Sequence, residues 1–208
     1  AVRRPYRMAL AHLHAAGLAW DERYPCVAAC PPTEQRVLAR QLAGNLNCVP
    51  TSSMGRLFDA VASMIGVRHV ATYEAQAAIE LEAVAETSHT DAYAFDLTGD
   101  EPIRIDPAPM WRALAADLLA GMPAARMAGK FHRGMAAAVV EVCRRIGRLE
   151  GLKTVGLSGG VFQNVTLLRL CVEGLRSAGF DVITHRQVPP NDGGIALGQA
   201  AIAAAITP

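Results

Sequence analysis

A single carboxylate, Asp192, stands between an extended proline pair and two glycines, in the run Val188-Pro189-Pro190-Asn191-Asp192-Gly193-Gly194. The prolines hold the backbone extended. Glycines let backbone N–H groups approach a ligand closely, so we expect those of Gly193 and Gly194 to face a cleft. A carboxylate here can cap the next helix, or it can hold a cation that holds phosphate. A lone Asp before two glycines is also typical of a simple turn.

A second glycine-rich turn, Ser158-Gly159-Gly160, lies upstream, between a predicted strand and a predicted helix. Ligands of open α/β sheets bind at such carboxyl ends of strands. Asn164 follows near the start of the helix, where its amide suits a ribose hydroxyl or a base edge, or caps the helix. The turn matches neither the Walker pattern nor the dinucleotide-binding pattern. Two such turns in one α/β unit indicate a nucleotide site with a metal.

A third polar block, Pro50-Thr51-Ser52-Ser53-Met54-Gly55-Arg56-Leu57-Phe58-Asp59, opens another predicted helix. Ser52 and Ser53 offer hydroxyls at the helix N-terminus, and Arg56 adds a planar cation, which together suit a phosphate or carbamoyl oxygen. Asp59 on the same helix can accept from ribose hydroxyls. The alternative is that Ser53 caps the helix while Arg56 and Asp59 form a surface i,i+3 pair.

Cysteines and histidines give weaker signals. Cys26 and Cys30 have C-x3-C spacing without a matching second pair, so we interpret the five cysteines as free thiols of a reducing, cytoplasmic compartment. The six histidines show no H-x3-H spacing for a metal on one helix face. We expect His132, in a basic helix start, to be exposed.

The composition of the chain limits the classes of protein to which it can belong. The chain has 208 residues, 51% of them hydrophobic and 5% aromatic, which favours helices built on Ala, Leu and Val. A formal net charge of +1 argues against non-specific nucleic-acid binding. No apolar run approaches the roughly 20 residues of a membrane span. Because the chain starts with Ala and opens almost directly on a helix pattern, we expect it to be a fragment of a longer protein.

The elements that must position these residues fall into two halves. The first half is mostly helical, with a hairpin after it, and Gly134 is a candidate break in a long helix. The end reads strand–turn–helix twice, which predicts a parallel βαβα unit in an α/β fold. The predicted helices are 3–16, 33–42, 56–65, 74–86, 108–119, 125–149, 164–177 and 193–205, and the predicted strands are 93–97, 102–105, 154–157 and 180–184.

In chain order, the block that begins at Pro50 is followed by Tyr73-Glu74-Ala75-Gln76-Ala77-Ala78, by the Ser158 turn and by the Asp192 run. This combination resembles the C-terminal part of the hydrogenase-maturation carbamoyltransferases, the HypF family. The resemblance covers essentially the whole chain. It implies an actin-like (ASKHA) fold, with residues 1–208 as the C-terminal lobe of a TsaD-like carbamoyltransferase domain. Members of the family carry acylphosphatase-like, zinc-finger-like and YrdC-like domains ahead of this region.

The resemblance also implies roles for the polar blocks. Asp59 would contact the nucleotide ribose; Gly159, Gly160 and Asn164 would contact adenosine. Asp192 would bind a divalent metal, whose other ligands come in relatives from a His-rich motif that is absent here.

The implied reaction uses carbamoyl phosphate and ATP to form carbamoyl-adenylate, whose carbamoyl group passes to the C-terminal Cys of a HypE-like partner. Transfer of this kind needs a polarised carbonyl and no protein nucleophile, so no cysteine is assigned a catalytic role, and the catalytic residues stay unassigned. Alternatives are an O-carbamoyltransferase, a tRNA threonylcarbamoyl-transferring relative, or a nucleotide-binding module without chemistry.

Overall fold

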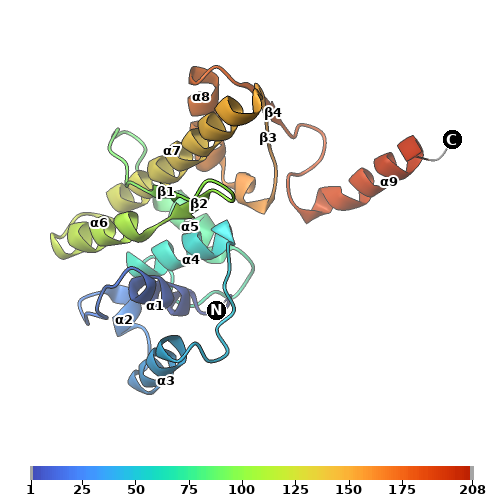
Figure 1. Cartoon of the computed structure of the whole chain (residues 1–208). Coiled ribbons are helices and arrows are strands. Elements are labelled where there is room, and N and C mark those ends of the chain that lie inside the picture. The colour runs from blue at the N-terminus through green and yellow to red at the C-terminus, as the bar shows by residue number, and fades with distance from the viewer. Residues whose placement is uncertain (1, 207–208) are drawn as a thin grey trace. The chain divides into compact units, whose positions relative to one another are not determined.

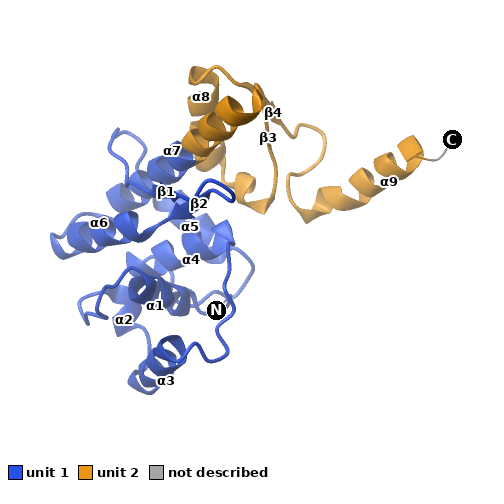
Figure 2. Ribbon diagram, viewed as in Figure 1, with its two compact units in different colours: residues 1–138 blue, residues 139–208 orange. Residues whose placement is uncertain are grey.

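The computed structural model describes residues 2–206 of the chain (Figure 1). Two compact units, Ala1–Ala138 and Val139–Pro208, divide it (Figure 2). One helix, α7 (Ala124–Glu150), begins in the first unit and ends in the second. Within the described range, no helix is both long enough and apolar enough to cross a membrane.

The first unit is mainly helical, as the sequence predicts. Its elements before α7 are α1 (Pro5–Ala15), α2 (Pro25–Ala28), α3 (Pro32–Ala43), α4 (Met54–Met64), α5 (Gln76–Val84), β1 (Asp96–Thr98), β2 (Arg104–Asp106) and α6 (Ala108–Leu119). The short α2 was not predicted, because one helical turn inside a proline-containing connection leaves no periodic apolar pattern. Proline stands in the first turn of α1, α2, α3 and α6, where its missing N–H costs nothing.

The core of this unit forms where α1 packs against α4, and α4 against α5. Leu10 and Leu13 of α1 are fully buried, as are Phe58 and Val61 of α4. Their three-residue spacing places each pair on one helix face. Burying such a side chain contributes about 1.5–3 kcal/mol, so this contact is a main source of the unit's stability.

An extended segment, residues 86–93, crosses α7 at two glycines; we call it the strap. The backbone N–H of Glu86 donates to the carbonyl of Ala125, and that of Tyr93 donates to the carbonyl of Lys130. A Cβ at Gly129 would lie 1.9 Å from the Glu86 carbonyl oxygen, and one at Gly134 would lie 2.2 Å from that of Tyr93. The predicted break at Gly134 is therefore wrong: α7 runs through it, and the glycine makes room for the strap.

The predicted hairpin exists, but its strands are shorter and shifted. Strands β1 and β2 pair antiparallel, with Asp96 opposite Asp106. Tyr93 was predicted to begin the first strand. It is instead buried beside α7, where its hydroxyl donates to Asp117 Oδ2 at 2.8 Å. Its backbone N–H also bonds to α7, so Tyr93 cannot join the hairpin ladder.

The second unit follows the predicted order of strand, turn and helix. After the end of α7 come β3 (Thr154–Leu157), the 3-10 turn η1 (Gly160–Gln163), α8 (Val165–Ser177), β4 (Asp181–Thr184), the 3-10 turn η2 (Asp192–Gly194) and α9 (Ile195–Ile206). Strands β3 and β4 pair in parallel, with Leu157 opposite Thr184. The predicted parallel βαβα unit is confirmed.

The core of the second unit is small. Leu167, Cys171 and Leu175 recur every four residues along α8 and are buried, together with Leu157 at the end of β3. This spacing forms one apolar face on the helix. The turn that follows β3 is therefore anchored by a buried residue directly before it.

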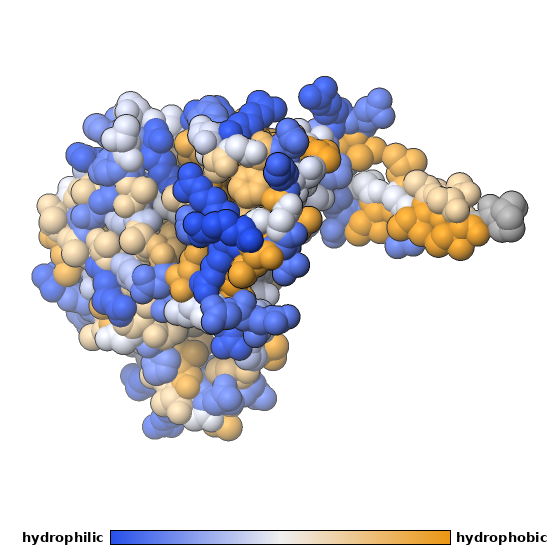
Figure 3. Space-filling model, turned by 45° about the horizontal axis from the view of Figure 1, so that its top comes forward, coloured by the Kyte–Doolittle hydropathy of each residue, from blue (hydrophilic) through white to orange (hydrophobic). Residues whose placement is uncertain are grey.

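The last helix, α9, is apolar and uncovered. None of its residues is buried within the described part of the chain. Ile195, Leu197 and Ile202 are all more than half exposed. The space-filling view shows hydrophobic residues over this helix (Figure 3). A run of this kind on a soluble protein is unusual unless another surface covers it.

Candidate functional site

The two glycine-rich turns of the second unit meet at the carboxyl edge of its sheet. Because Leu157 pairs with Thr184, the next residues, Ser158 and His185, leave the two strands side by side. His185 Nε2 lies 2.9 Å from Ser158 Oγ in a hydrogen bond. The N–H of Gly159 donates to the carbonyl of Pro190 at 2.8 Å. Both turns therefore lie at one edge of the sheet.

These turns border an open depression of about 350 Å³. Its lining residues are Ser158, Gly159, His185, Pro189, Pro190, Asn191, Asp192, Gly194 and Ile195. Parallel α/β sheets bind ligands at this edge, outside the carboxyl ends of their strands. The depression therefore occupies the position where the sequence predicts a ligand.

The first turn depends on Gly159. Its φ is +101°, a backbone conformation that side-chain-bearing residues rarely adopt. This conformation ends β3 and opens η1, so that the chain turns from the strand toward α8. Gly159 therefore has a structural role in this turn. Contact of Gly159 and Gly160 with adenosine stays a prediction.

The second turn is organised by Asn191. Its side-chain oxygen accepts from the N–H of Gly193 at 3.0 Å, and its backbone carbonyl accepts from the N–H of Gly194 at 3.0 Å. The expectation that these two N–H groups face the cleft is therefore wrong, because the turn itself uses them. Asp192 opens η2 and remains exposed at the depression.

Asn164 has a structural role that the sequence left open. It is the N-cap of α8, and its side-chain oxygen accepts from the N–H of Leu167 at 2.7 Å. This bond satisfies one of the N–H groups that a helix start leaves without a partner. A contact of the Asn164 amide with a nucleotide stays a prediction, and it would have to coexist with the cap.

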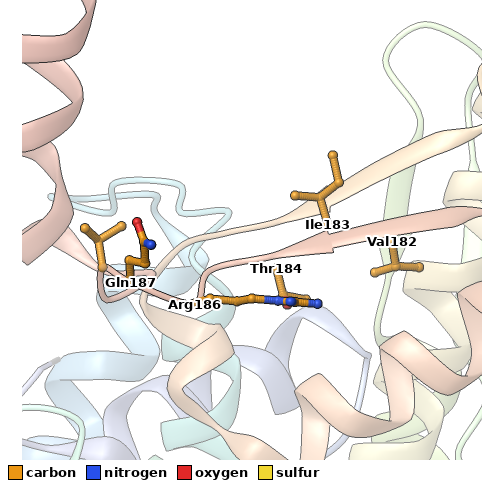
Figure 4. Close-up of a pocket in the computed structure, with 6 residues that line it drawn as sticks. Val182, Ile183, Thr184, Arg186 and Gln187 are labelled. Atoms are coloured by element: carbon orange, nitrogen blue, oxygen red, sulfur yellow. The ribbon is translucent and has the colours of Figure 1, made fainter.

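A larger depression of about 540 Å³ runs along β4. Figure 4 shows Ile183 on the opposite side of the strand from Val182 and Thr184, as strand alternation requires. Ile183 is 62% exposed. This hollow contains none of the predicted site residues, so we assign the chemistry to the smaller depression at Asp192.

In the first unit, Ser52 and Ser53 lie exposed at the start of α4. Ser53 is the N-cap by position, yet within the described residues its side chain makes no capping bond. Both hydroxyls are thus presented at the surface, whereas the N–H of Arg56 in the first helical turn already donates to the carbonyl of Ser53 at 3.1 Å. An eleven-residue helix adds a partial positive charge at that end. The geometry suits an anion.

Arg56 and Asp59 face each other one turn into α4. Arg56 Nη1 lies 2.6 Å from Asp59 Oδ2. Asp59 is only 3% exposed, and this burial raises the pKa of its carboxyl, while the Arg56 charge partly opposes the rise. The surface pair that the sequence allowed is therefore a buried one. Arg56 Nη1 is buried, and among the described residues it has no aligned hydrogen-bond partner despite the short ion pair.

The predicted site residues thus form two groups. Ser52, Ser53, Arg56 and Asp59 belong to the first unit, whereas Gly159, Gly160, Asn164 and Asp192 belong to the second. Each group is assembled within its own unit.

His132 differs from its predicted exposed state. It is fully buried on α7, with Nδ1 bonded to the carbonyl of Ala128 at 2.8 Å and its ring edge-on to Phe58. Burial lowers the pKa of its imidazole. A charged, solvent-facing role is thereby excluded, and His132 is part of the core.

The cysteines are free thiols, as predicted. Cys26 and Cys30 are buried, and burial raises the pKa of their thiols to about 12 and about 11. A thiol that stays protonated is a poor nucleophile and a poor metal ligand.

A divalent metal requires several oxygen or nitrogen ligands. Among the described residues, no three His, Cys, Asp or Glu side chains converge on one point. Asp192 supplies a single carboxylate, which seldom holds a divalent ion by itself. The residues that the structure describes therefore do not form a complete metal site.

The sequence alone does not single out His185 as a candidate, because this histidine shows no metal-ligand spacing. The signal that locates it is positional: it directly follows β4, as Ser158 directly follows β3. Polar residues at that point of parallel strands meet at one edge.

The chain is similar to known proteins over nearly its whole length. The family model described as "Carbamoyltransferase, Kae1-like Domain, second subdomain" matches residues 1–199. The chain belongs to the HypF carbamoyltransferase family. It is 36% identical to carbamoyltransferase HypF2 of Cupriavidus necator over 98% of its length, and 39% identical to carbamoyltransferase HypF of Rhodobacter capsulatus over 97%. It spans only 28% and 25% of those two HypF relatives.

A solved HypF structure has the same fold. It is titled "Crystal structure of full-length HypF in the phosphate- and nucleotide-bound form" and matches 99% of this chain with a TM-score of 0.88 and 34% identity. The chain covers 27% of that HypF molecule. The predicted α/β fold and the predicted HypF resemblance are both confirmed.

Proposed function

We propose that this chain is the part of a HypF-type enzyme that passes a carbamoyl group from carbamoyl-adenylate to the C-terminal Cys thiol of a HypE-like partner. The carbamoyl-adenylate would be made from ATP and carbamoyl phosphate by the complete protein. The observation that carries the proposal is the pair of glycine-rich turns bonded together at the carboxyl edge of β3 and β4, with Asp192 beside them.

The family supports the reaction class, since the relatives are carbamoyltransferases. The solved HypF structure is titled as phosphate- and nucleotide-bound, and it aligns with nearly all of this chain. We propose that the same ligand classes bind here. Gly159 and Gly160 would let an adenosine lie against the backbone, with Asn164 near it.

The first unit contains its own set of groups suited to an acyl-phosphate oxygen. The start of α4 presents Ser52, Ser53 and a helix N-terminus, which together suit an anionic or carbonyl oxygen. The buried Arg56 Nη1 without an aligned partner is the kind of atom that a bound oxygen satisfies. Asp59 would accept from ribose hydroxyls once Arg56 turns to the ligand.

Asp192 would contribute one carboxylate to a cation held jointly with residues outside this chain. The proposal follows from its place at the depression and from the chemistry of carboxylates.

The direct test uses the complete protein with ATP, carbamoyl phosphate and a partner that ends in Cys. Mass spectrometry of the partner's C-terminal peptide should show a carbamoylated Cys, and a partner whose terminal Cys is replaced by Ser should remain unmodified. Carbamoylation of a hydroxyl acceptor or of tRNA with no thiol product would contradict the proposal.

Asp192 gives a sharper version of the test. In the complete protein, Asp192→Ala should abolish transfer to the thiol while carbamoyl-adenylate still forms. Adenylate formation is measured separately, by exchange of labelled pyrophosphate into ATP. Loss of both half-reactions together would contradict the assignment of Asp192 to transfer.

A further inference from the structure

Transfer from an adenylate to a thiol releases a proton, and the structure offers a group to take it. The lining of the Asp192 depression contains two kinds of proton acceptor, the Asp192 carboxylate and the His185 imidazole. As side-chain classes, imidazoles accept protons near neutral pH far better than carboxylates do. His185 is the candidate base at this edge of the sheet, because its Nε2 also contacts Ser158 Oγ.

The contact with Ser158 gives that base a defined direction. His185 Nε2 and Ser158 Oγ are 2.9 Å apart, within the range for proton transfer along a hydrogen bond. Both side chains are exposed at the depression, and both directly follow strands whose register is fixed by β3 and β4. Rigid strands hold such pairs more accurately than loops do.

We infer that Ser158 and His185 act as a proton-accepting pair for the carbamoyl transfer. This inference rests on the proposed function. The thiol sulfur attacks the carbamoyl carbon, and the C–S bond forms as the C–O bond to AMP breaks. AMP leaves with the electron pair of that bond. The thiol proton passes to Ser158 Oγ while the hydroxyl proton of Ser158 passes to His185 Nε2, which later releases it to water.

This assignment differs from a nucleophilic Ser–His pair. Ser158 carries the proton and forms no covalent bond to the carbamoyl group, so the enzyme has no acyl-serine intermediate. His185 must be neutral to accept, with its proton on Nδ1. The Gly159 N–H to Pro190 carbonyl bond keeps the two turns together while the proton moves.

The test measures thiol transfer by the complete protein, with carbamoyl-adenylate formation measured in parallel. Ser158→Ala and His185→Ala should each lower kcat for transfer by about 10²-fold or more, the usual contribution of a general base. Adenylate formation should stay unchanged. Because the two residues act as one unit, the double variant should be no slower than the slower single variant.

Two measurements separate proton transfer from simple positioning. His185→Gln keeps a hydrogen-bond partner for Ser158 but cannot take a proton, so it should be as slow as His185→Ala. Added imidazole should restore part of the rate of His185→Ala and leave Ser158→Ala unchanged. His14→Ala, at an exposed histidine of α1, is the matched control and should retain the wild-type rate.

The outcomes are distinct. Full activity of His185→Gln, or additive effects of the two alanine variants, would overturn the proton-accepting role. Normal transfer by all the variants would overturn it as well, with the proposed function intact. A wild-type protein that forms adenylate but carbamoylates no thiol would overturn the proposed function itself.

Discussion

The two units hold their candidate site residues in opposite ways. In the first unit, Asp59 of α4 lies in the core, and its partner Arg56 is also largely covered. In the second unit, Ser158, His185 and Asp192 stand exposed at the ends of a two-stranded sheet. The first group is fixed by packing, whereas the second is fixed by turn geometry and a few hydrogen bonds.

The difference shows where each unit tolerates change. A densely packed unit transmits a small misfit to many neighbours, because its interior cannot expand without losing contacts. At an open sheet edge, by contrast, a substitution affects mainly the residues that form the turn. Substitutions in the first unit should therefore affect mainly stability, and those in the second should affect mainly ligand chemistry.

The largest effect is expected where the strap crosses α7. Gly129→Ala and Gly134→Ala each place a methyl group within about 2 Å of a strap carbonyl, so the strap must move. We expect each to lower the free energy of unfolding by about 3 kcal/mol or more, measured by urea denaturation.

The matched control is Gly198→Ala in α9, where a Cβ would meet nothing within 4 Å. Alanine favours helix over glycine by roughly 1 kcal/mol, so this variant should be neutral or stabilising. Equal destabilisation by all three substitutions would contradict the expectation that the first unit is more sensitive to substitution than the second.

Asn164 tests whether an open-edge residue can serve both fold and ligand. Asn164→Ala should cost about 1 kcal/mol of stability because α8 loses its cap. Asn164→Asp keeps an oxygen for Leu167 and should fold normally, but it replaces the amide by a second oxygen. If the amide binds nucleotide, titration calorimetry should show weaker binding for the Asp variant. An unchanged affinity of the Asp variant for nucleotide would contradict binding by the Asn164 amide.

Tyr93 tests a polar contact of the packed unit. Burial and the neighbouring Asp117 both raise the pKa of its hydroxyl, so Tyr93 stays a neutral donor to that carboxylate. Lys130 Nζ lies 2.5 Å from the same carboxylate and 4.4 Å from the Tyr93 ring centroid. Tyr93→Phe should cost about 1 kcal/mol in chemical unfolding. Tyr73→Phe, at an exposed tyrosine, should cost nothing measurable.

The smallest effect is a change with pH. Burial raises the pKa of Asp59 in the folded state, so the folded protein binds this proton more tightly than the unfolded chain does. Wild type should therefore gain stability relative to Asp59→Asn as pH falls from the raised pKa toward the ordinary value of 3.8. Urea unfolding of both proteins at two pH values should show that their difference in stability grows as the pH falls. A difference that does not change with pH would contradict a raised pKa for Asp59.

The sequence predicted the helices, the parallel strands and the glycine-rich turns, because these follow from local periodicity and turn chemistry. It failed where a distant segment decides the outcome. Gly134 resembles a helix break until the strap is known to pass over it, and His132 resembles a surface residue until Phe58 packs on it. The meeting of Ser158 with His185 likewise depends on strand register, which the sequence does not specify residue by residue.

The strap has a consequence for hydrogen exchange. The amides of Glu86 and Tyr93 belong to no helix or strand, yet both donate to carbonyls of α7. They can exchange with solvent only when the strap lifts from the helix, so their protection should match that of the α7 amides beneath them rather than that of loop amides. The slowest exchange of the first unit would then extend into a segment that secondary structure alone describes as irregular.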